Sequence, residues 1–195
     1  MGKEKYQKIL EVLLKKSPIV SFDSVERLVK NKKNVKQYAK HIVRNLIIKN
    51  KLKRLIPGFY SIHDDPSLAV FCFKPAYLGL QSSLSSYDLW EQETIPVIIT
   101  SKKVRQGVRK VNSMNVLIRR IDKKYVFGIE YKKEGGFYFP YSDIEKTFID
   151  MIYFRENISK EILAEIKRKI DKKKLNAYLK NYNQRFRKKV LKVIN

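Results

Sequence analysis

The sequence contains very little cysteine and no long apolar run. Cys72 is the only cysteine, which excludes an internal disulfide and every zinc site built from several cysteines. The longest apolar run, residues 68–73, is far shorter than the roughly 18 residues that span a bilayer. Since the first residues also lack the apolar stretch of a signal peptide, we expect a cytoplasmic protein with no membrane partner.

Histidine and glycine-rich motifs are also scarce. His41 and His63 are the only histidines, and neither belongs to a His/Cys cluster with metal-ligand spacing. No glycine-rich phosphate loop occurs, and Gly135-Gly136 is typical of a hairpin turn. Cys72 lies in an apolar run, so we expect a buried thiol rather than a nucleophile. These absences predict no bound metal, no cofactor and no enzymatic activity.

Acidic residues are too few to balance the basic ones. The chain has 43 Lys and Arg against 19 Asp and Glu, a net charge of +24. Residues 1–63 carry +12, residues 64–159 carry +2 and residues 160–195 carry +10. Such a surplus favours a polyanionic partner, either nucleic acid or an anionic membrane surface. Codon bias in an AT-rich genome can supply lysines but does not remove acidic residues, so nucleic acid is the better hypothesis.

The first 62 residues predict three helices followed by a β-hairpin. Apolar residues recur at helical spacing over about 3–16, 24–30 and 35–46. Asp23-x-x-Glu26 is typical of a capping box for the second helix, and Asn34 of an N-cap for the third. Two short strands then flank a turn dipeptide, Pro57-Gly58. This order is that of a winged helix-turn-helix domain.

The third helix of this domain is the candidate recognition helix. A major groove admits one α-helix, whose long polar side chains reach base edges and phosphates. Gln37 suits adenine and Arg44 suits guanine or phosphate by their donor and acceptor geometry. A charged helix face is often merely solvated, so the hypothesis depends on the element order and the local charge together. The expected DNA contacts are Lys36, Gln37, Lys40, His41 and Arg44 on the helix, with Lys51, Lys53 and Arg54 in the hairpin.

Residues 66–195 predict a mixed α+β domain that ends in helices. The patterns indicate a helix at 77–90, buried strands at 97–100 and 116–119, a half-buried strand at 125–131 and its return at 137–139. Ser142-x-x-Glu145 is typical of a capping box, and Ser159 of the N-cap of the basic helical tail. We therefore predict an α+β fold with two domains, a winged helix-turn-helix at 1–62 and an α+β domain at 66–195.

Two alternatives remain open at this point. Asp122 with Glu130-x-Lys132 is similar to the carboxylate and lysine arrangement of metal-dependent nucleases. The alternation of the strand places Glu130 and Lys132 opposite its apolar residues, so an exposed strand face explains them more simply. An RNA-binding module is the other alternative, for which a preference for structured RNA over duplex DNA would discriminate.

Several stretches resemble the AbiEi-type antitoxins of the abortive-infection AbiE systems, a type IV toxin-antitoxin family. The resemblance covers about residues 5–160, and position 79 holds Gly79 where the family more often has Ser. The stretches that carry it are Leu52–Tyr60, Tyr77–Ser85, Val97–Thr100 and Ser142–Tyr153.

The resemblance implies a two-part protein. Its N-terminal winged helix represses its own operon, and its C-terminal domain neutralises a nucleotidyltransferase-like toxin without forming a stable complex. Related proteins serve as stand-alone regulators. We expect the partner to be double-stranded operator DNA with inverted repeats. Charge alone suggests a further antitoxicity or nucleic-acid surface at Lys102, Lys103, Arg105 and Arg109.

Overall fold

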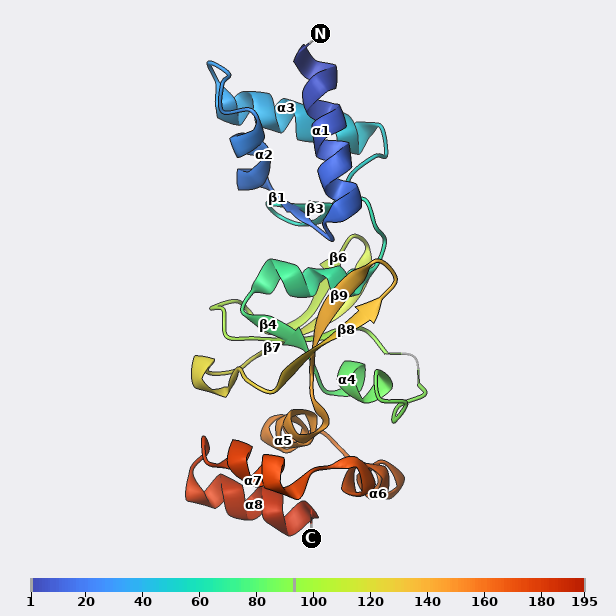
Figure 1. The fold of residues 1–195 in the computed structure, drawn as a ribbon, viewed down its shortest axis with the longest axis vertical. Helices are drawn as coiled ribbons and strands as arrows, with labels where there is room; N and C mark the ends of the chain where they lie inside the picture. The colour runs from blue at the N-terminus through green and yellow to red at the C-terminus, as the bar shows by residue number, and fades with distance from the viewer. Residues whose placement is uncertain (1, 93, 195) are drawn as a thin grey trace. The chain divides into compact units, whose positions relative to one another are not determined.

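A computed structural model of the chain describes residues 2–92 and 94–194. It mixes helices and strands, with a six-stranded sheet and helices at the C-terminal end, which confirms the predicted α+β class. The chain divides into two compact units, one of Met1–Cys72 with Lys110–Asn115 and one of Phe73–Arg109 with Val116–Asn195. Figure 1 shows the elements of both units.

The first unit alternates helices with short strands. β1 and β2 both pair antiparallel with β3, so the small sheet has the order β1-β3-β2. A 3₁₀ segment, η1 (Pro66–Phe73), follows this sheet. The elements before it are α1 (Gly2–Lys16), β1 (Val20–Ser21), α2 (Phe22–Leu28), α3 (Val35–Ile48), β2 (Lys53–Ile56) and β3 (Phe59–Ser61).

The core of the first unit forms between its three helices and the sheet. Leu10 and Leu14 of α1 are buried, and on α3 the buried residues are Ala39, Ile42, Val43 and Leu46. Helical spacing predicts one apolar face on α1, made of Tyr6, Ile9, Leu10, Leu13 and Leu14. This face is too wide, because Ile9 is 37% exposed and Leu13 39% exposed. Among the described residues of α1, only Leu10 and Leu14, at i and i+4, are buried in this core.

The helix starts of the first unit were predicted with mixed success. Asn34 is confirmed as the N-cap of α3, since its side chain accepts from the Gln37 N–H. The capping box at Asp23 was wrong. Ser21 caps α2 instead, with its Oγ 3.2 Å from the Ser24 amide nitrogen, so the helix begins earlier. Strand β1 was missed because two residues are too short to show a period.

The second unit contains the large sheet, whose strand order is β6-β7-β5-β4-β9-β8. β4 pairs antiparallel with β5 and parallel with β9, while β5 pairs parallel with β7. The strands are β4 (Ala76–Leu78), β5 (Val97–Thr100), β6 (Gly107–Val111), β7 (Met114–Arg120), β8 (Ile129–Glu134) and β9 (Phe137–Ser142). The helices are α4 (Gln81–Ser85), η2 (Lys123–Tyr125), α5 (Ile144–Phe154), α6 (Lys160–Lys169), α7 (Lys172–Leu179) and α8 (Gln184–Ile194).

The predicted helix at 77–90 was wrong. Its first residues form β4, which is hydrogen-bonded to a neighbouring strand on each side, and only Gln81–Ser85 is helical. Leu80 connects the two with a φ of 54°, a left-handed conformation that no helix contains. Long-range strand pairing has therefore overridden the local helical pattern.

Other predictions in the second unit were corrected by one or a few residues. The strand predicted at 125–131 begins only at Ile129, after the 3₁₀ turn η2. Asp143, rather than Ser142, caps α5, since its carboxylate accepts from the Lys146 N–H at 2.8 Å. The strands at 97–100, 116–119 and 137–139 are confirmed, as are the N-cap at Ser159 and the buried Cys72.

The C-terminal helices share one apolar core with the sheet. Buried residues of β4, β5 and α5 form one cluster with residues of α6, α7 and α8, and Figure 1 shows these four helices gathered on one side of the sheet. The sequence predicts an apolar stripe along the basic tail, and its members Ile166 and Val190 are both 0% exposed, while Leu163 and Phe186 are only partly buried. The tail is therefore an integral layer of the second unit.

Gly79 has a packing reason in this chain. A Cβ at this position would lie 2.5 Å from Ile99 Cδ1, within the buried core. We expect Gly79→Ser to lower the free energy of unfolding by about 1–3 kcal/mol, because the serine overpacks this contact. Urea denaturation followed by tryptophan fluorescence would measure it. Adding Ile99→Val, which removes Cδ1, should recover part of the loss, and a Gly79→Ser variant as stable as wild type would contradict this account.

Candidate nucleic-acid interface

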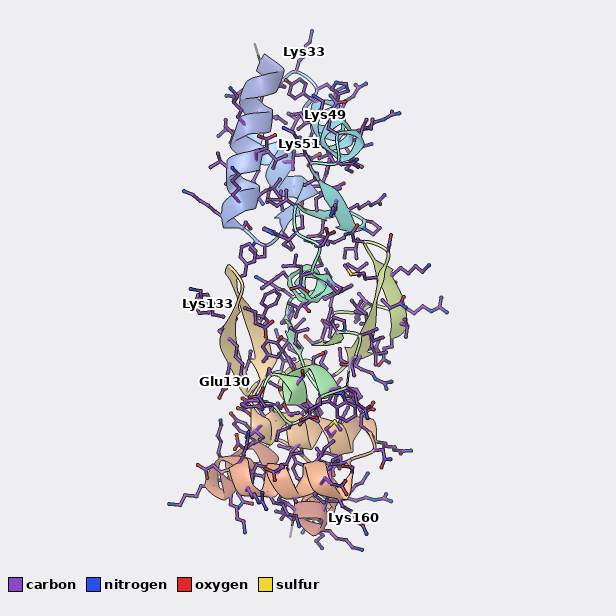
Figure 2. All side chains as sticks on the ribbon, turned by 90° about the vertical axis from the view of Figure 1, so that its right-hand side faces the viewer. Lys33, Lys49, Lys51, Glu130, Lys133 and Lys160 are labelled. Atoms are coloured by element: carbon purple, nitrogen blue, oxygen red, sulfur yellow. The ribbon has the colours of Figure 1, made fainter. Side chains whose placement is uncertain are left out.

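The outward face of α3 carries the polar side chains that the sequence singled out. Lys36, Gln37, Lys40, His41 and Arg44 are all exposed, whereas the buried residues of the same helix are Ala39, Ile42, Val43 and Leu46. The helix contains no acidic residue at all. Figure 2 shows further lysine side chains of this unit projecting outward at Lys33 and Lys49. The helix therefore presents a cationic face to solvent.

The three cations of α3 are not neutralised within the protein. Lys36, Lys40 and Arg44 form no ion pair with any residue that the structure describes. They are spaced at i, i+4 and i+8, so each lies next to a like charge on the helix surface, which is unfavourable. An anionic partner along this face would relieve the repulsion.

The two neutral polar residues of the face already have partners. The Asn34 side-chain amide donates to Gln37 Oε1 at 2.9 Å, and Asn45 lies 3.2 Å from His41 Nε2. Gln37 keeps its own amide N–H groups as donors and a second lone pair on Oε1. Asn34 and Asn45 thus hold the orientation of side chains that would otherwise rotate freely.

A cleft of about 430 Å³ opens at the N-terminal end of α3. The Lys32 ammonium group lies 5.6 Å from the centre of the Tyr6 ring and 5.4 Å from the centre of the Tyr38 ring. Cation–π contacts of this kind keep the ammonium group close to the cleft. The cleft is lined by Lys32, Lys33, Asn34, Gln37, Tyr38 and His41.

The basic residues of the hairpin differ in their surroundings. Lys51 is ion-paired with Glu11 at 3.0 Å, and Lys53 is ion-paired with Asp64. Arg54 is exposed and has no ion pair among the described residues. Arg54 is thus the hairpin cation that is most available to a phosphate. The sequence alone does not show which of the three cations are ion-paired, because the partners of Lys51 and Lys53 lie outside the hairpin, at Glu11 and Asp64.

The second candidate surface lies in the second unit, between β5 and the end of β6. Lys102, Lys103, Arg105 and Arg109 are all exposed. Arg109 donates to the Arg105 carbonyl at 2.9 Å, which holds these two arginines together. The structure thus brings Arg105 and Arg109 together, and Lys102 and Lys103 lie in the segment that follows β5.

The residues of the nuclease alternative have structural roles. Tyr87 donates to Glu130 Oε2 at 2.8 Å. Lys132 donates to the Ser86 carbonyl at 2.9 Å and lies 3.2 Å from the centre of the Tyr87 ring. Burial against this ring lowers the pKa of Lys132. Asp122 precedes η2, on a different element, and no group of three or more potential metal ligands occurs among the described residues.

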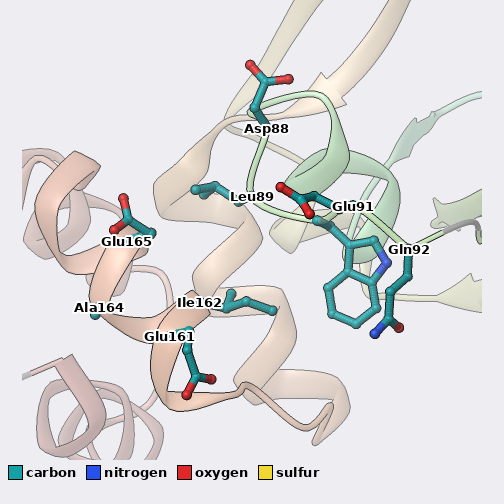
Figure 3. A pocket seen from close by; sticks show the side chains of 9 residues that line it. Asp88, Leu89, Glu91, Gln92, Glu161, Ile162, Ala164 and Glu165 are labelled. Atoms are coloured by element: carbon teal, nitrogen blue, oxygen red, sulfur yellow. The ribbon is translucent and has the colours of Figure 1, made fainter.

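A pocket of about 490 Å³ in the second unit has the opposite charge (Figure 3). Four carboxylates line it, those of Asp88, Glu91, Glu161 and Glu165, and its remaining wall is largely apolar. Such a pocket repels phosphate groups. This pocket is therefore not a candidate phosphate site.

A buried charged cluster in α5 was missed by the sequence analysis. The side chains of Lys146 and Asp150 are fully buried and ion-paired with each other, and Tyr77 donates to Asp150 Oδ2 at 2.7 Å. Burial lowers the pKa of Lys146 and raises those of Asp150 and Tyr77. A Lys and an Asp four residues apart within an apolar helix were the available signal.

A second ion-pair cluster fixes α7 against the start of α5. Lys174 lies 3.1 Å from Asp143 Oδ2 and 3.0 Å from Glu145 Oε2, and Tyr178 donates to Asp143 Oδ2 at 2.6 Å. Although partial burial opposes it, hydrogen bonding to these two carboxylates raises the pKa of Lys174. These contacts join α7 to the start of α5.

Comparisons with known proteins bear on the fold alone. No protein-family model matches the sequence, and no curated protein matches it. Among solved structures, the chain is similar to the crystal structure of the Rv2827c protein from Mycobacterium tuberculosis, with a TM-score of 0.59 and 10% sequence identity. The similarity covers 98% of this chain and 78% of that one. Among the described residues, no helix is both long and apolar enough to cross a bilayer.

Proposed function

We propose that the chain is a DNA-binding transcriptional regulator whose first unit is a winged helix-turn-helix domain. The order helix, strand, helix, helix, strand, strand supports this proposal, together with the β1-β3-β2 sheet. In domains of this kind one helix enters the major groove and the hairpin contacts the neighbouring backbone. Here α3 is the recognition helix and β2–β3 is the wing.

The observation that carries the proposal is the exposed face of α3. It combines three cations that have no ion-pair partner in the part of the chain that the structure describes with Gln37 and His41, and the helix has no acidic residue. A face that is merely hydrated usually mixes both signs of charge. Lys36 and Lys40 bind phosphates and position the protein, while Gln37 and Arg44 read base edges. Arg54 of the wing adds a phosphate contact.

The resemblance to AbiEi-type antitoxins supports a finer proposal, in which the chain represses its own operon and counteracts a nucleotidyltransferase-like toxin. The matching stretch Ser142–Tyr153 is buried almost throughout, so its residues specify the core of the second unit. The surface of Lys102, Lys103, Arg105 and Arg109 is the exposed candidate for the antitoxin role. A stand-alone regulator would use α3 in the same way.

Fluorescence anisotropy with labelled nucleic acids tests the proposal. The probes are the DNA upstream of the chain's own gene, a scrambled duplex of equal length and a structured RNA. We expect the upstream duplex to bind at least about 1000-fold more tightly than the scrambled one at physiological salt. Equal, fully salt-sensitive binding to both duplexes would reject specific recognition, and tighter binding to RNA would favour the RNA-binding alternative.

The nuclease alternative predicts a different result. Because Lys132 is held by Ser86 and Tyr87, and because Glu130 is held by Tyr87, we expect no cleavage of DNA or RNA in the presence of Mg²⁺. Gel electrophoresis of labelled DNA and RNA would detect any cleavage products. Cleavage that disappears in Glu130→Ala would overturn this expectation.

A further inference from the structure

A second cationic site lies in the second unit, at the contact between the end of α5 and the start of α8. A cleft of about 510 Å³ opens there. Its volume falls within the range of sites that bind small molecules, roughly 300–1,000 Å³. No acidic side chain lines it. The lining residues are Arg155, Asn183, Arg185, Phe186 and Lys189.

The three cations of this cleft have no side-chain partner among the described residues. The structure shows no ion pair and no hydrogen bond of the Arg155, Arg185 or Lys189 side chain with a described residue. The neighbouring Arg187 side chain, in contrast, donates to the Tyr182 and Lys180 carbonyls, both at 2.6 Å. The guanidinium group of Arg187, which has a structural role, is therefore hydrogen-bonded, whereas those of Arg155 and Arg185 are not hydrogen-bonded to any described residue. Arg185 and Lys189 are four residues apart on α8, so two like charges meet on one face, which is unfavourable without an anion.

Arg155 occupies a backbone position that usually belongs to glycine or asparagine. It ends α5 with φ 60° and ψ 36°, and its N–H donates to the Ile152 carbonyl at 3.3 Å. The left-handed conformation is unfavourable for a residue with a Cβ. A glycine would end the helix with less strain, so the backbone does not explain the arginine. Its side chain contributes the third positive charge of the cleft.

The remaining two residues complete the walls of the cleft. Phe186 is packed against Tyr182, with 4.9 Å between ring centres, and against Tyr153 at 5.9 Å, so it is a partly buried residue at the edge of the core. Asn183 accepts from the Phe186 N–H through Oδ1 at 2.9 Å. This bond leaves the amide nitrogen of Asn183 free to donate to a ligand.

We propose that this cleft binds a phosphate group, carried either by a free nucleotide or by a nucleic-acid chain. Guanidinium groups present parallel N–H donors that match phosphate oxygens, and Lys189 adds a point charge. The site is distinct from the α3 face and does not depend on the proposed DNA recognition. It gives the basic C-terminal helices a ligand-binding role in addition to their packing.

Isothermal titration calorimetry on the full chain tests the site, with pyrophosphate, adenosine diphosphate and a short single-stranded oligonucleotide as probes. Arg185→Gln/Lys189→Gln should weaken binding by about tenfold or more, since two of three phosphate contacts are lost. The matched control is Lys188→Gln/Lys192→Gln, which removes two exposed charges from the same helix at the same spacing. It should leave affinity within about twofold.

The three probes distinguish the sources of the phosphate. If adenosine diphosphate binds as tightly as the oligonucleotide, the phosphate belongs to a free nucleotide. If only the oligonucleotide binds, the phosphate belongs to a nucleic-acid chain. Equal losses in the two double variants, or no binding of any probe, would overturn the proposal.

Arg155→Gly separates a binding role from a structural one. We expect it to weaken binding by about tenfold while leaving the melting temperature unchanged or higher, because glycine relieves the left-handed backbone. An arginine with only a structural role would show the reverse, a lower melting temperature with unchanged affinity, and that result would overturn the proposal.

Discussion

Asp150→Ala is expected to lower the free energy of unfolding of the second unit by about 3–5 kcal/mol. The substitution leaves the fully buried Lys146 ammonium without its ion-pair partner and the Tyr77 hydroxyl without its acceptor. A buried charge without a partner is among the most destabilising changes a core can undergo. Trp90, the only tryptophan, lies in the second unit. Urea denaturation followed by its fluorescence therefore reports on this unit.

The control for this prediction is the exposed pair of Glu165 and Arg168. They are ion-paired at 2.6 Å, with side chains that are 42% and 74% exposed. Removing Glu165 should change stability by less than about 0.5 kcal/mol, since water screens the pair. A loss in Asp150→Ala no larger than that in Glu165→Ala would contradict the account of the buried cluster.

The buried pair is expected to contribute little when both partners are replaced together. Tyr77→Phe/Lys146→Met/Asp150→Leu removes every polar group of the cluster and keeps the core filled. Because desolvation opposes the attraction within a buried pair, the free energy of unfolding of the triple variant should lie within about 1–2 kcal/mol of the wild-type value. Thermal unfolding of the single and triple variants measures this recovery, and a triple variant less stable than Asp150→Ala would disprove it.

The pH dependence of Lys146→Met follows from the direction of the Asp150 shift. Burial raises the pKa of Asp150 even beside Lys146, and removing the cation leaves burial as the dominant effect. A carboxyl with a raised folded-state pKa stabilises the fold at low pH and loses that contribution as the pH rises through that pKa. The stability gap between Lys146→Met and wild type should therefore narrow as the pH is lowered from neutrality. A gap that widens would contradict the assignment.

Lys40→Ala/Arg44→Ala is expected to weaken binding to the upstream duplex by about 100-fold. Arg44 contributes about 1–3 kcal/mol if it contacts a base edge, and Lys40 contributes a phosphate contact. Both side chains are exposed and neither has an ion-pair partner in the described part of the chain. Their removal should therefore act on the complex rather than on the fold. Anisotropy titrations at several salt concentrations measure it.

The control is Lys8→Ala/Lys15→Ala, which removes the same charge from exposed positions of α1 in the same unit. It should change affinity by less than about fivefold, through the overall charge alone. In the Lys40→Ala/Arg44→Ala variant, the slope of log affinity against log salt concentration should decrease in magnitude by about one to two, because about one to two fewer counterions are released. Equal losses in the two double variants would mean that charge, not the α3 face, determines binding.

The α3 face was predictable because its evidence is local. Buried residues from Ala39 to Leu46 recur at helical spacing, and this places Lys40 and Arg44 on the opposite side. The Asn34 cap lies three residues before the amide it accepts from, so it too could be identified in the sequence. For the same reason the strand at 97–100 was predicted correctly from four consecutive apolar residues.

The features that the sequence did not predict depend on contacts between residues that are distant in sequence. β4 is a strand because β5 and β9 pair with it, although its residues fit a helical pattern. The ion pair of Lys51 with Glu11 joins residues forty positions apart, and no local pattern distinguishes this lysine from Arg54. The cleft of Arg155 and Lys189 likewise forms only when α8 folds back against the end of α5.

We propose that α3 reads base edges in duplex DNA. The most direct measurement is the affinity of wild type and Arg44→Ala for the upstream duplex and for a set of its single-base-pair variants. We expect Arg44→Ala to lose discrimination at one or two base pairs, by about 1–3 kcal/mol, and to keep it at the other base pairs. A uniform loss across all variants would show that Arg44 contacts only phosphate, and an unchanged affinity profile would contradict recognition through α3.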